Sequence, residues 1–461
     1  MKNLFKIIGI IAIVAIIGFS MAACVNEDST SGTTATPTAN LGSGQYEKGT
    51  PIILSTETEG AAIYYNTKGT EHPARDDCDE YTGPIILNTA LNITAYAYKS
   101  GMSPSEYLRV SYILKGDEFD NLTKLDEWLK ANPVNTAATS YTIKLNVGDS
   151  LVGTGTVLGN NKTKYVNLDL SGSTSTSIPY AEFSGCTNLT GVTIPNSVTS
   201  IEDSAFNGCT GITEITIPNG VTIIKSYAFS YCTGITAITI PDSVTQILGK
   251  AFYGTSLTGE INISDKITSI GSGAFGGCKK LTALKVAETH STYLSEGGIL
   301  YNKAKTTLVA YPAGLAPTDN LLIPITVTEI GNGAFSGCNN FDRIAFNSVT
   351  SIGRSAFEDC TSLTLVIIPD SVTSIGTDAF SSARSLTSVT IPSNIDKIEN
   401  AVFYLCNSLT SVTFKVAGIN FGTGSFVNPT NTNNLKTAYT AGGAGTYTRP
   451  DSSSTTWTKQ P

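Results

Sequence analysis

More than half of the sequence follows a repeat of about 23 residues, and this repeat limits what the chain can fold into. The repeat is marked by phenylalanines at spacings of 22, 23 or, at one break, 60 residues: Phe183, Phe206, Phe229, Phe252, Phe275, Phe335, Phe357, Phe380 and Phe403. A segment this short cannot bury its own apolar face, whereas a stack of such segments buries a continuous core. Residues 178–414 therefore predict a solenoid of stacked 23-residue coils.

The apolar residues within one unit indicate how a coil is built. Ile212, Ile215 and Ile217 are separated by polar residues, which predicts a short strand with these side chains turned inwards. A second apolar pair, Val221 and Ile224, follows the proline that ends this strand. We expect neighbouring coils to stack at about 4.8 Å, the spacing of paired strands.

Seven of the nine cysteines occupy one position of the repeat. They are Cys186, Cys209, Cys232, Cys278, Cys338, Cys360 and Cys406, and Thr255 and Ala383 fill the same position in two other units. A position that accepts threonine or alanine requires a small buried group and not a metal ligand or nucleophile. The paired spacing of a zinc site is absent, and parallel Cβ vectors on adjacent coils suit a disulfide poorly. We expect free, buried thiols.

The units share a longer motif. Residues 194–201 read IPNSVTSI and residues 368–376 read IPDSVTSIG, and each motif is followed by Ala-Phe and then by Gly-Cys or Asp-Cys. These motifs resemble the BspA-like leucine-rich repeats of bacterial surface proteins. The resemblance implies a repeat array at the cell surface that attaches to host proteins or to other cells, and it carries no catalytic residues.

The N-terminus has the three parts of an export signal. Lys2 and Lys6 precede an apolar run of about 13 residues, which is too short to span a bilayer comfortably, and small residues lead to Cys24. Residues 1–23 resemble a bacterial lipoprotein signal peptide, which implies an exported protein anchored in the cell envelope by lipid on Cys24. Residues 24–43 lack recurring apolar residues and predict a flexible tether.

Residues 44–114 alternate with period two between turn residues, which predicts a small β-sandwich. The segments IYYNT at 63–67, YTGPI at 81–85 and ITAYA at 93–97 resemble the chitobiase/β-hexosaminidase C-terminal-type domain. That module is not the catalytic part of those enzymes, so the resemblance implies no hydrolase activity. The predicted fold class is mainly β, a leucine-rich-repeat solenoid preceded by this small domain.

Three further segments complete the organisation. Residues 115–177 hold one helical apolar pattern and two alternating ones, which predict a helix-plus-strand cap on the first coil. A hairpin insertion is expected at about residues 286–323, with its turn at Asn302–Lys305. The periodicity fades over residues 415–461, which predict a C-terminal cap and a polar tail.

Composition argues against several classes of function. Only 14% of the residues are charged and the formal net charge is −8, so the chain offers no basic stripe for nucleic acid. His72 and His290 are far apart, and no nucleophile–base pair or carboxylate pair recurs at close spacing. We therefore expect no enzyme activity and no cofactor.

One acidic loop raises the question of a metal site. The loop is formed by Asp76, Asp77, Asp79 and Glu80. Carboxylate oxygens suit hard cations such as calcium, but the spaced D-x-D-x-D-G pattern of a calcium loop is absent. We expect a solvated acidic loop and no metal.

The outward positions of the predicted strands are mostly small and uncharged, as expected for a surface of threonine and serine. Six positions depart from this pattern and are the candidate partner-binding residues: Glu214, Glu260, Lys285, Arg343, Leu365 and Ile367. Repeat solenoids bind along such equivalent strand positions.

The leading hypothesis is a lipid-anchored surface protein that binds a host matrix protein or another cell-surface protein. The alternative is a glycan-binding accessory protein that uses the β-sandwich.

The lipid anchor can be tested on Cys24 itself. Replacing Cys24 with alanine removes the thiol that would be acylated, so metabolic labelling with a radioactive fatty acid should be abolished. Labelled protein that survives the Cys24→Ala change would refute the anchor.

Overall fold

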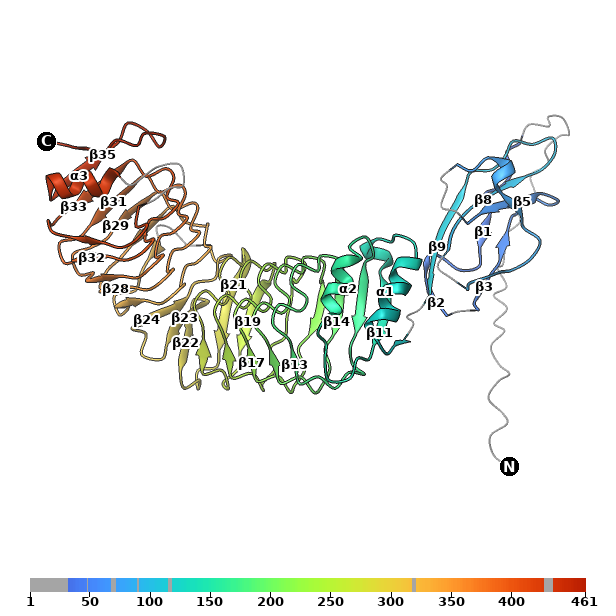
Figure 1. The fold of residues 1–461 in the computed structure, drawn as a ribbon, viewed down its shortest axis with the longest axis horizontal. Coiled ribbons are helices and arrows are strands. Elements are labelled where there is room, and N and C mark those ends of the chain that lie inside the picture. Colours follow the sequence, from blue (N-terminus) through green and yellow to red (C-terminus); the bar gives the residue numbers. More distant parts are fainter. Residues whose placement is uncertain are drawn as a thin grey trace, which may run out of the picture. The chain divides into compact units, whose positions relative to one another are not determined.

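The computed structural model describes residues 32–47, 49–67, 72–88, 91–114, 118–316, 321–426 and 434–461. The signal peptide expected over residues 1–23 and the lipid site expected at Cys24 lie outside this part. The chain divides into two compact units, one made of residues up to 42, 52–85 and 92–110 and one made of residues 43–51, 86–91 and 111–461, which contains the solenoid (Figure 1). We call the strands between residues 38 and 114 the β domain. Strands dominate both units, as the predicted fold class requires.

The β domain contains a five-stranded sheet in the order β2-β9-β8-β5-β6 and the strand pairs β1–β4 and β3–β7. Its elements are β1 Thr38–Ala39, β2 Gly44–Tyr46, β3 Pro51–Ile52, β4 Leu54–Ser55, β5 Ala62–Asn66, the 3₁₀ turn Arg75–Asp77, β6 Asp79–Glu80, β7 Ile85–Ile86, β8 Leu91–Tyr98 and β9 Leu108–Leu114. Ile52 and Leu54 from the small pairs are buried together with Ile63 and Ile93 from the larger sheet. The apolar side chains of the alternating pattern thus form this core.

The tether expected over residues 24–43 is not flexible where the structure describes it. Thr38 pairs with Ser55 in the antiparallel β1–β4 ladder. Thr34 is buried, and its hydroxyl donates to the carbonyl of Ser103 at 2.6 Å. Hydrogen bonds and the burial of Pro37 hold this segment, and neither produces the apolar periodicity by which a strand is recognised in a sequence.

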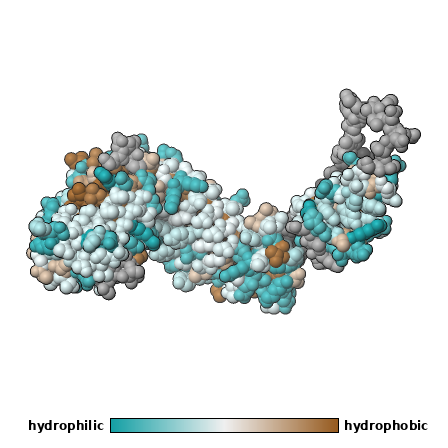
Figure 2. All heavy atoms as spheres, turned by 90° about the horizontal axis from the view of Figure 1, so that it is seen from above, coloured by the Kyte–Doolittle hydropathy of each residue, from teal (hydrophilic) through white to brown (hydrophobic). Residues whose placement is uncertain are grey.

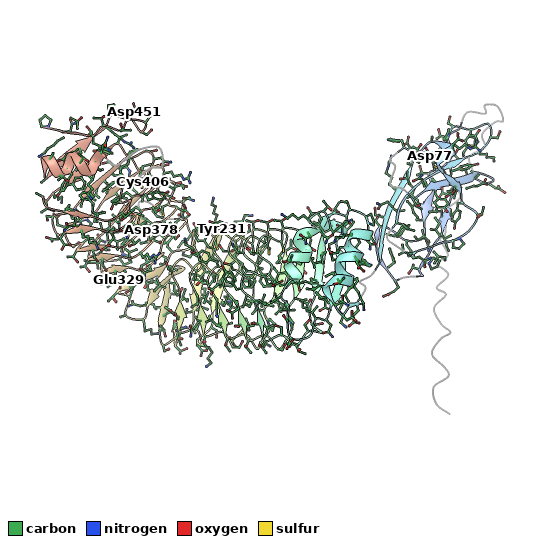
Figure 3. All side chains as sticks on the ribbon, viewed as in Figure 1. Asp77, Tyr231, Glu329, Asp378, Cys406 and Asp451 are labelled. Atoms are coloured by element: carbon green, nitrogen blue, oxygen red, sulfur yellow. The ribbon has the colours of Figure 1, made fainter. Side chains whose placement is uncertain are left out.

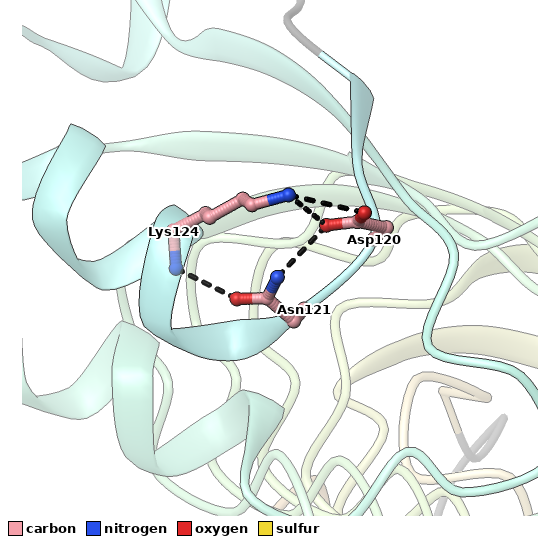
Figure 4. A network of polar contacts seen from close by, with 3 residues as sticks. All are labelled: Asp120, Asn121 and Lys124. Atoms are coloured by element: carbon pink, nitrogen blue, oxygen red, sulfur yellow. Dashed lines mark hydrogen bonds and ion pairs between the residues drawn. The ribbon is translucent and has the colours of Figure 1, made fainter.

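The N-terminal cap of the solenoid begins with β10 Glu118–Phe119 and helix α1 Leu122–Ala131, and α1 confirms the helical pattern. The Asn121 side chain accepts a hydrogen bond from the Lys124 backbone N–H at 2.9 Å, which satisfies a free donor of the first turn. Asp120 adds an ion pair with the Lys124 ammonium at 2.8 Å (Figure 4).

A second helix, α2 Thr154–Asn160, was not predicted. It begins after Gly153, whose φ of 96° favours glycine, and it contains Gly155, where a Cβ atom would clash with the carbonyl of Glu182. The helix is short and rich in small residues, so no 3.6-residue apolar stripe marks it. The cap also contains the 3₁₀ turn Ala137–Thr139 and β11 Tyr141–Leu145, which precede this helix, and β12 Val166–Asp169 follows it.

The solenoid has two strand faces, and each coil contributes at most one short strand to each face. Strands of neighbouring coils pair in parallel. The outer strand face is formed by β12 Val166–Asp169, β14 Leu189–Thr193, β16 Glu214–Thr216, β19 Thr258–Ile263, β21 Lys280–Val286, β25 Leu321–Leu322, β27 Arg343–Ala345, β29 Leu365–Ile367, β31 Ser388–Ile391 and β33 Ser411–Phe414. The second face is formed by β13 Ser177–Ile178, β15 Ser200–Ile201, β17 Ile223–Ile224, β18 Gln246–Ile247, β20 Ser269–Ile270, β26 Glu329–Ile330, β28 Ser351–Ile352, β30 Ser374–Ile375, β32 Lys397–Ile398 and β34 Asn420–Phe421.

The repeated phenylalanines form two stacked ladders in the core. Successive rings from Phe183 to Phe275 and from Phe335 to Phe403 are 5.0 to 5.4 Å apart and nearly parallel. The backbone follows the same pattern, since the N–H of Phe229 donates to the carbonyl of Ala251 in the next coil at 2.7 Å. Both the ring and the backbone of one coil therefore depend on its neighbour.

At the surface, threonine side chains also form hydrogen bonds between neighbouring coils. The Thr222 hydroxyl donates to the Thr199 carbonyl at 3.2 Å, and Thr245 repeats the bond to Thr222 at 3.2 Å. These hydroxyls satisfy backbone acceptors between coils without introducing charge. This contact explains why the chain can have so few charged residues.

The repeat-position cysteines are free and buried, which confirms the expectation. The thiol of Cys232 donates to the carbonyl of Phe206 at 3.0 Å, and Cys360 donates to Phe335 at 3.1 Å. In a coil without cysteine, the Thr255 hydroxyl donates to the Phe252 carbonyl at 3.0 Å. This repeat position therefore requires a small side chain, and a weak hydrogen-bond donor there satisfies a buried backbone carbonyl.

The predicted hairpin insertion is present between the two ladders. Strand β23 Ile299–Asn302 pairs antiparallel with β24 Thr307–Ala310 around the expected turn, and an additional strand, β22 Tyr293–Glu296, pairs with β23. The buried core divides at this point, with Leu300 in the first cluster and Tyr301 in the second. The insertion thus joins two halves that each have a core.

The C-terminal segment is more ordered than the expected cap and polar tail. Helix α3 Asn434–Gly442 is followed by β35 Gly445–Thr448, which pairs antiparallel with β33, and by β36 Thr458–Lys459. Tyr447 is fully buried, and the Arg449 guanidinium donates to the Leu409 carbonyl at 2.6 Å. An antiparallel strand thus covers the last coil edge, and a search for the 23-residue period cannot reveal it.

The ladder predicts a large stability cost for one ring. Phe229→Ala leaves a cavity between two stacked rings and should lower the free energy of unfolding by about 3–5 kcal/mol. Urea unfolding followed by circular dichroism measures this. Tyr180→Ala is the control, because the Tyr180 side chain is 74% exposed and its loss should change little. Equal effects of the two substitutions would contradict the ladder's role.

Candidate functional site

The six candidate partner-binding residues lie on the outer strand face but not in one sheet. Glu214 is on β16, at the end of the sheet β10-β11-β12-β14-β16, and Glu260 and Lys285 are on the separate pair β19–β21. Arg343, Leu365 and Ile367 are on the sheet that runs from β25 to β36. The structure therefore does not assemble the six residues into a single site.

Two of the candidate charges neutralise each other. The Lys285 ammonium lies 3.2 Å from the Glu260 carboxylate, and both side chains are about half exposed. Such a surface ion pair contributes between about 0 and 1 kcal/mol to stability. Glu214 is separated from Glu260 by the coil at residues 235–240, which forms no strand in the described structure. This half of the face offers no concentrated charge.

The other half brings three candidates together. Arg343 on β27 is the register partner of Leu365 on β29, and Ile367 lies two residues further along the same strand. Ile367 is 60% exposed although it sits in a sheet, because its side chain is on the outward row. A large exposed aliphatic side chain beside a cation is typical of a contact surface.

Two residues that extend this surface were missed in the sequence. Leu322 on β25 is 62% exposed and pairs with Ala345 on β27. Because Ile344 pairs with Val366, the next residue, Ala345, lies opposite Ile367 on β29. Leu322 and Ile367 therefore lie in one row across three strands. Ile325 is 75% exposed in the turn after β25. We call Leu322, Ile325, Leu365 and Ile367 the apolar strand patch. The sequence contains a signal for this patch, because the residue after the repeat proline is Ile325 here, whereas it is Asp370 in another unit.

Exposed apolar side chains are the exception on this molecule. In the view of Figure 2 most of the surface is teal or white, and brown residues form only small groups. The apolar strand patch, on β25, on β29 and in the turn after β25, therefore contrasts with the mainly polar surface of the molecule.

The second face has a groove of about 540 Å³ over β26, β28 and β30. Its lining carries charges of both signs, among them Glu329, Arg354 and Glu399, together with serine and glycine (Figure 3 labels Glu329). No histidine or cysteine lines it. The groove is thus lined by a mixture of serine, glycine and charged side chains of both signs.

The buried thiols are also poorly suited to chemistry. Burial raises the pKa of Cys232 to about 12 and that of Cys406 to about 12. A thiol must lose its proton to become a nucleophile, so these groups are inert at neutral pH. Cys406 lies in the interior of the second half of the solenoid (Figure 3).

The β domain carries a cluster of tyrosines that was also missed. Tyr64 and Tyr96 are register partners on β5 and β8, and their rings stack 5.6 Å apart. The Arg75 guanidinium lies 4.9 Å from the Tyr64 ring centre and 5.2 Å from that of Tyr98, and it donates to the Tyr64 hydroxyl at 2.9 Å. The sequence carries a signal for this cluster, since Tyr64, Tyr96 and Tyr98 recur within its alternating segments.

The described ranges contain neither a metal-binding cluster nor a membrane-spanning helix. There, no group of three or more histidine, cysteine or carboxylate side chains converges to hold a metal ion. The acidic loop near Asp77, labelled in Figure 3, is included in that statement. Across the same ranges, none of the helices combines the length and the apolar character needed to cross a bilayer.

In the part of the chain that the structure describes, the architecture is a solenoid of stacked parallel coils preceded by a small β domain. Residues 161–296 and 315–438 match the family described as BspA type leucine rich repeat region. The match covers more than half of the chain, and the protein belongs to this family. Residues 41–108 match the chitobiase/beta-hexosaminidase C-terminal domain family.

Solved structures with related folds come from bacteria. A leucine-rich repeat protein from Eubacterium ventriosum is 26% identical, with a TM-score of 0.51 over 60% of this chain and 77% of that chain. A leucine rich cell surface protein from Faecalibacterium prausnitzii is 25% identical, with a TM-score of 0.46 over 69% and 85%. The pneumococcal vaccine antigen PcpA is 18% identical, with a TM-score of 0.40 over 75% and 86%. No curated protein sequence matches the chain.

Proposed function

We propose that this protein is an exported, lipid-anchored bacterial surface protein that binds another protein through the outer strand face of its solenoid and catalyses no reaction. The observation that carries the proposal is the apolar strand patch, where Leu322, Ile325 and Ile367 are each at least 60% exposed. Exposing these side chains to water is unfavourable, and a partner that covers them would reverse that cost.

The arrangement of the patch suits a protein partner. Leu322 on β25 and Leu365 and Ile367 on β29 belong to one sheet and are separated by β27, so backbone hydrogen bonds fix their relative positions, and Ile325 lies in the turn after β25. Arg343 lies beside them, and a cation at the edge of an apolar area is common in protein interfaces. Membership of a family that includes surface proteins supports export, and the N-terminal signal supports lipid attachment. A host matrix protein or another cell-surface protein fits this surface.

A glycan-binding accessory role is the second candidate, and the tyrosine cluster of the β domain favours it. Aromatic rings with a neighbouring arginine can stack on and hydrogen-bond a sugar. The Tyr64 ring, however, already contacts Tyr96 on one side and Arg75 on another. The Tyr98 ring contacts Arg75 as well, and the Tyr107 ring contacts Tyr96 and Arg109, and for this reason we prefer the strand face.

A binding screen followed by paired substitutions tests the proposal. The chain of residues 25–461 is screened against matrix proteins and a glycan array. For a protein that binds, Leu322→Asp with Ile367→Asp should weaken the affinity at least about tenfold, because both charges would be desolvated in the interface. The matched control is Val134→Asp with Val152→Asp, two exposed aliphatic residues of the N-terminal cap, which should leave the affinity unchanged.

The remaining outcomes separate the alternatives. Equal losses in the two double variants would contradict the strand patch as the binding surface. If Lys285→Ala with Arg343→Ala leaves binding unchanged, these two cations have no part in it. Binding to glycans alone, abolished by Tyr98→Ala, would overturn the proposal in favour of the accessory role.

A further inference from the structure

The strand ladders of the solenoid are interrupted where the hairpin insertion begins. On the outer strand face the pair β19–β21 ends at β21, and the next sheet starts at β25. On the second face one sheet ends at β20, and the next starts at β22, which belongs to the insertion. Among the described residues, no strand ladder therefore joins the first half of the solenoid, with Phe183 to Phe275, to the second half, with Phe335 to Phe403.

Backbone bonds also become fewer here on the turn side, the side of each coil that carries its ladder phenylalanine. In the coil before the junction, the N–H groups of Lys250, Phe252 and Gly254 all donate to carbonyls of the next coil. At the junction itself, the described structure has one such bond, from the Gly277 N–H to the Ser336 carbonyl at 3.0 Å. The turn-side backbone thus couples the two halves more weakly than it couples the coils before them.

The insertion supplies further contacts between the halves. Its strands β22 and β23 lie against β21. Two backbone bonds of 2.9 Å accompany this packing, from Leu284 to Gly298 and from Gly314 to Leu281. The Ile270 N–H on β20 donates to the Tyr293 hydroxyl at 2.9 Å, whereas a paired strand would offer it a carbonyl. Isolated bonds and apolar packing thus stand where two continuous ladders run elsewhere.

Glycines surround the one turn-side bond that joins the two halves. The backbone is left-handed at Gly273, Gly277, Gly333 and Gly337, and a Cβ atom on Gly337 would lie 2.6 Å from the Gly277 Cα. The two coils approach so closely here that only glycine fits. Glycine also changes its φ and ψ angles at the lowest steric cost, which suits a residue at a hinge.

Two side chains of the first half reach across both glycine coils. The Lys250 ammonium lies 2.9 Å from the Glu358 carboxylate, and the Tyr253 hydroxyl donates to Asp359 at 2.8 Å. The partners in each contact are more than 100 residues apart in the sequence. Burial lowers the pKa of Lys250, but the hydrogen bond and the charge of Glu358 raise it above its usual value overall. The attraction thus exceeds the cost of burying the ammonium.

The Tyr253 ring lies along the glycines of both halves. The side chain is buried, and a Cβ atom on Gly276 would lie 2.9 Å from its ring. A Cβ atom on Gly337 would lie 3.2 Å from its hydroxyl oxygen. Because Asp359 accepts the hydrogen bond from this hydroxyl, the ring is attached at one end to the first half and at the other to the second.

We propose that the two halves of the solenoid form a hinge at the glycine coils, and that Lys250, Tyr253, Glu358 and Asp359 form a clasp that holds the hinge in one position. The clasp then fixes the distance between the strand pair β19–β21 of the first half and the apolar strand patch of the second half. Its release would change which partner surfaces could contact both. The hinge rests on the contacts at the junction and does not depend on the proposed function.

Distances between spin labels, measured by double electron–electron resonance, test the hinge. Residues 25–461 are prepared with Cys78→Ser, so that this partly exposed thiol takes no label. The exposed positions changed by Asp242→Cys and Asp396→Cys carry labels on either side of the junction. Glu358→Gln with Asp359→Asn keeps the shape of both side chains and removes their charges, so the distribution of distances between the labels should widen.

Two controls separate hinge motion from a general loosening of the fold. Labels placed by Tyr180→Cys and Asp242→Cys both lie in the first half, and their distances should be the same with and without the clasp. Glu202→Gln removes a charge from the ion pair with Lys225, which is also partly buried but lies within the continuous ladders of the first half. It should leave the distances across the junction unchanged.

Unchanged distances across the junction in the double clasp variant would overturn the proposal, because the glycine coils and the insertion would then hold the halves by themselves. Equal widening within the first half would overturn it as well, as would equal widening in Glu202→Gln. If the double variant does not fold, Tyr253→Phe keeps the ring and removes one clasp bond. It should widen the same distribution, and an unchanged distribution would overturn the proposal.

Discussion

The rest of the structure depends on the hydrogen bonds that the ladder phenylalanines, except Phe275, donate from their backbone N–H groups to a carbonyl of the next coil. These backbone bonds fix the spacing between coils. At this spacing the rings stack, the thiols donate to carbonyls, and the surface threonines donate to the preceding coil. A coil without a neighbour loses all of these contacts together. This dependence explains both the regular sequence and the need for caps at the two ends.

The same dependence locates the functional candidates. Positions used for stacking must stay constant, so a partner can be recognised only where the repeat varies without harm. The apolar strand patch is a place of this kind. Ile325 replaces a polar turn residue, so that its side chain is exposed at a cost that the coil itself does not require.

Much of the fold could be predicted from the sequence because it depends on spacing. The ladders, the free thiols, helix α1 and the hairpin turn near Asn302 all follow from residues that are close together or recur at a fixed interval. Features held by other means were missed. Helix α2 has no apolar stripe, Thr34 is held by hydrogen bonds, and β35 pairs once with the last coil. The contacts of Lys250 and Tyr253 join residues more than 100 apart, which no period reveals.

Amide hydrogen exchange measured by mass spectrometry on the unmodified chain and on Phe229→Ala tests the central claim of mutual dependence. If coils are stabilised mainly by their neighbours, the substitution should accelerate exchange in peptides containing Phe206 and Phe252, and leave those containing Phe380 unchanged. Acceleration confined to the peptide that contains residue 229 would contradict this account, because it would mean that each coil is stable by itself.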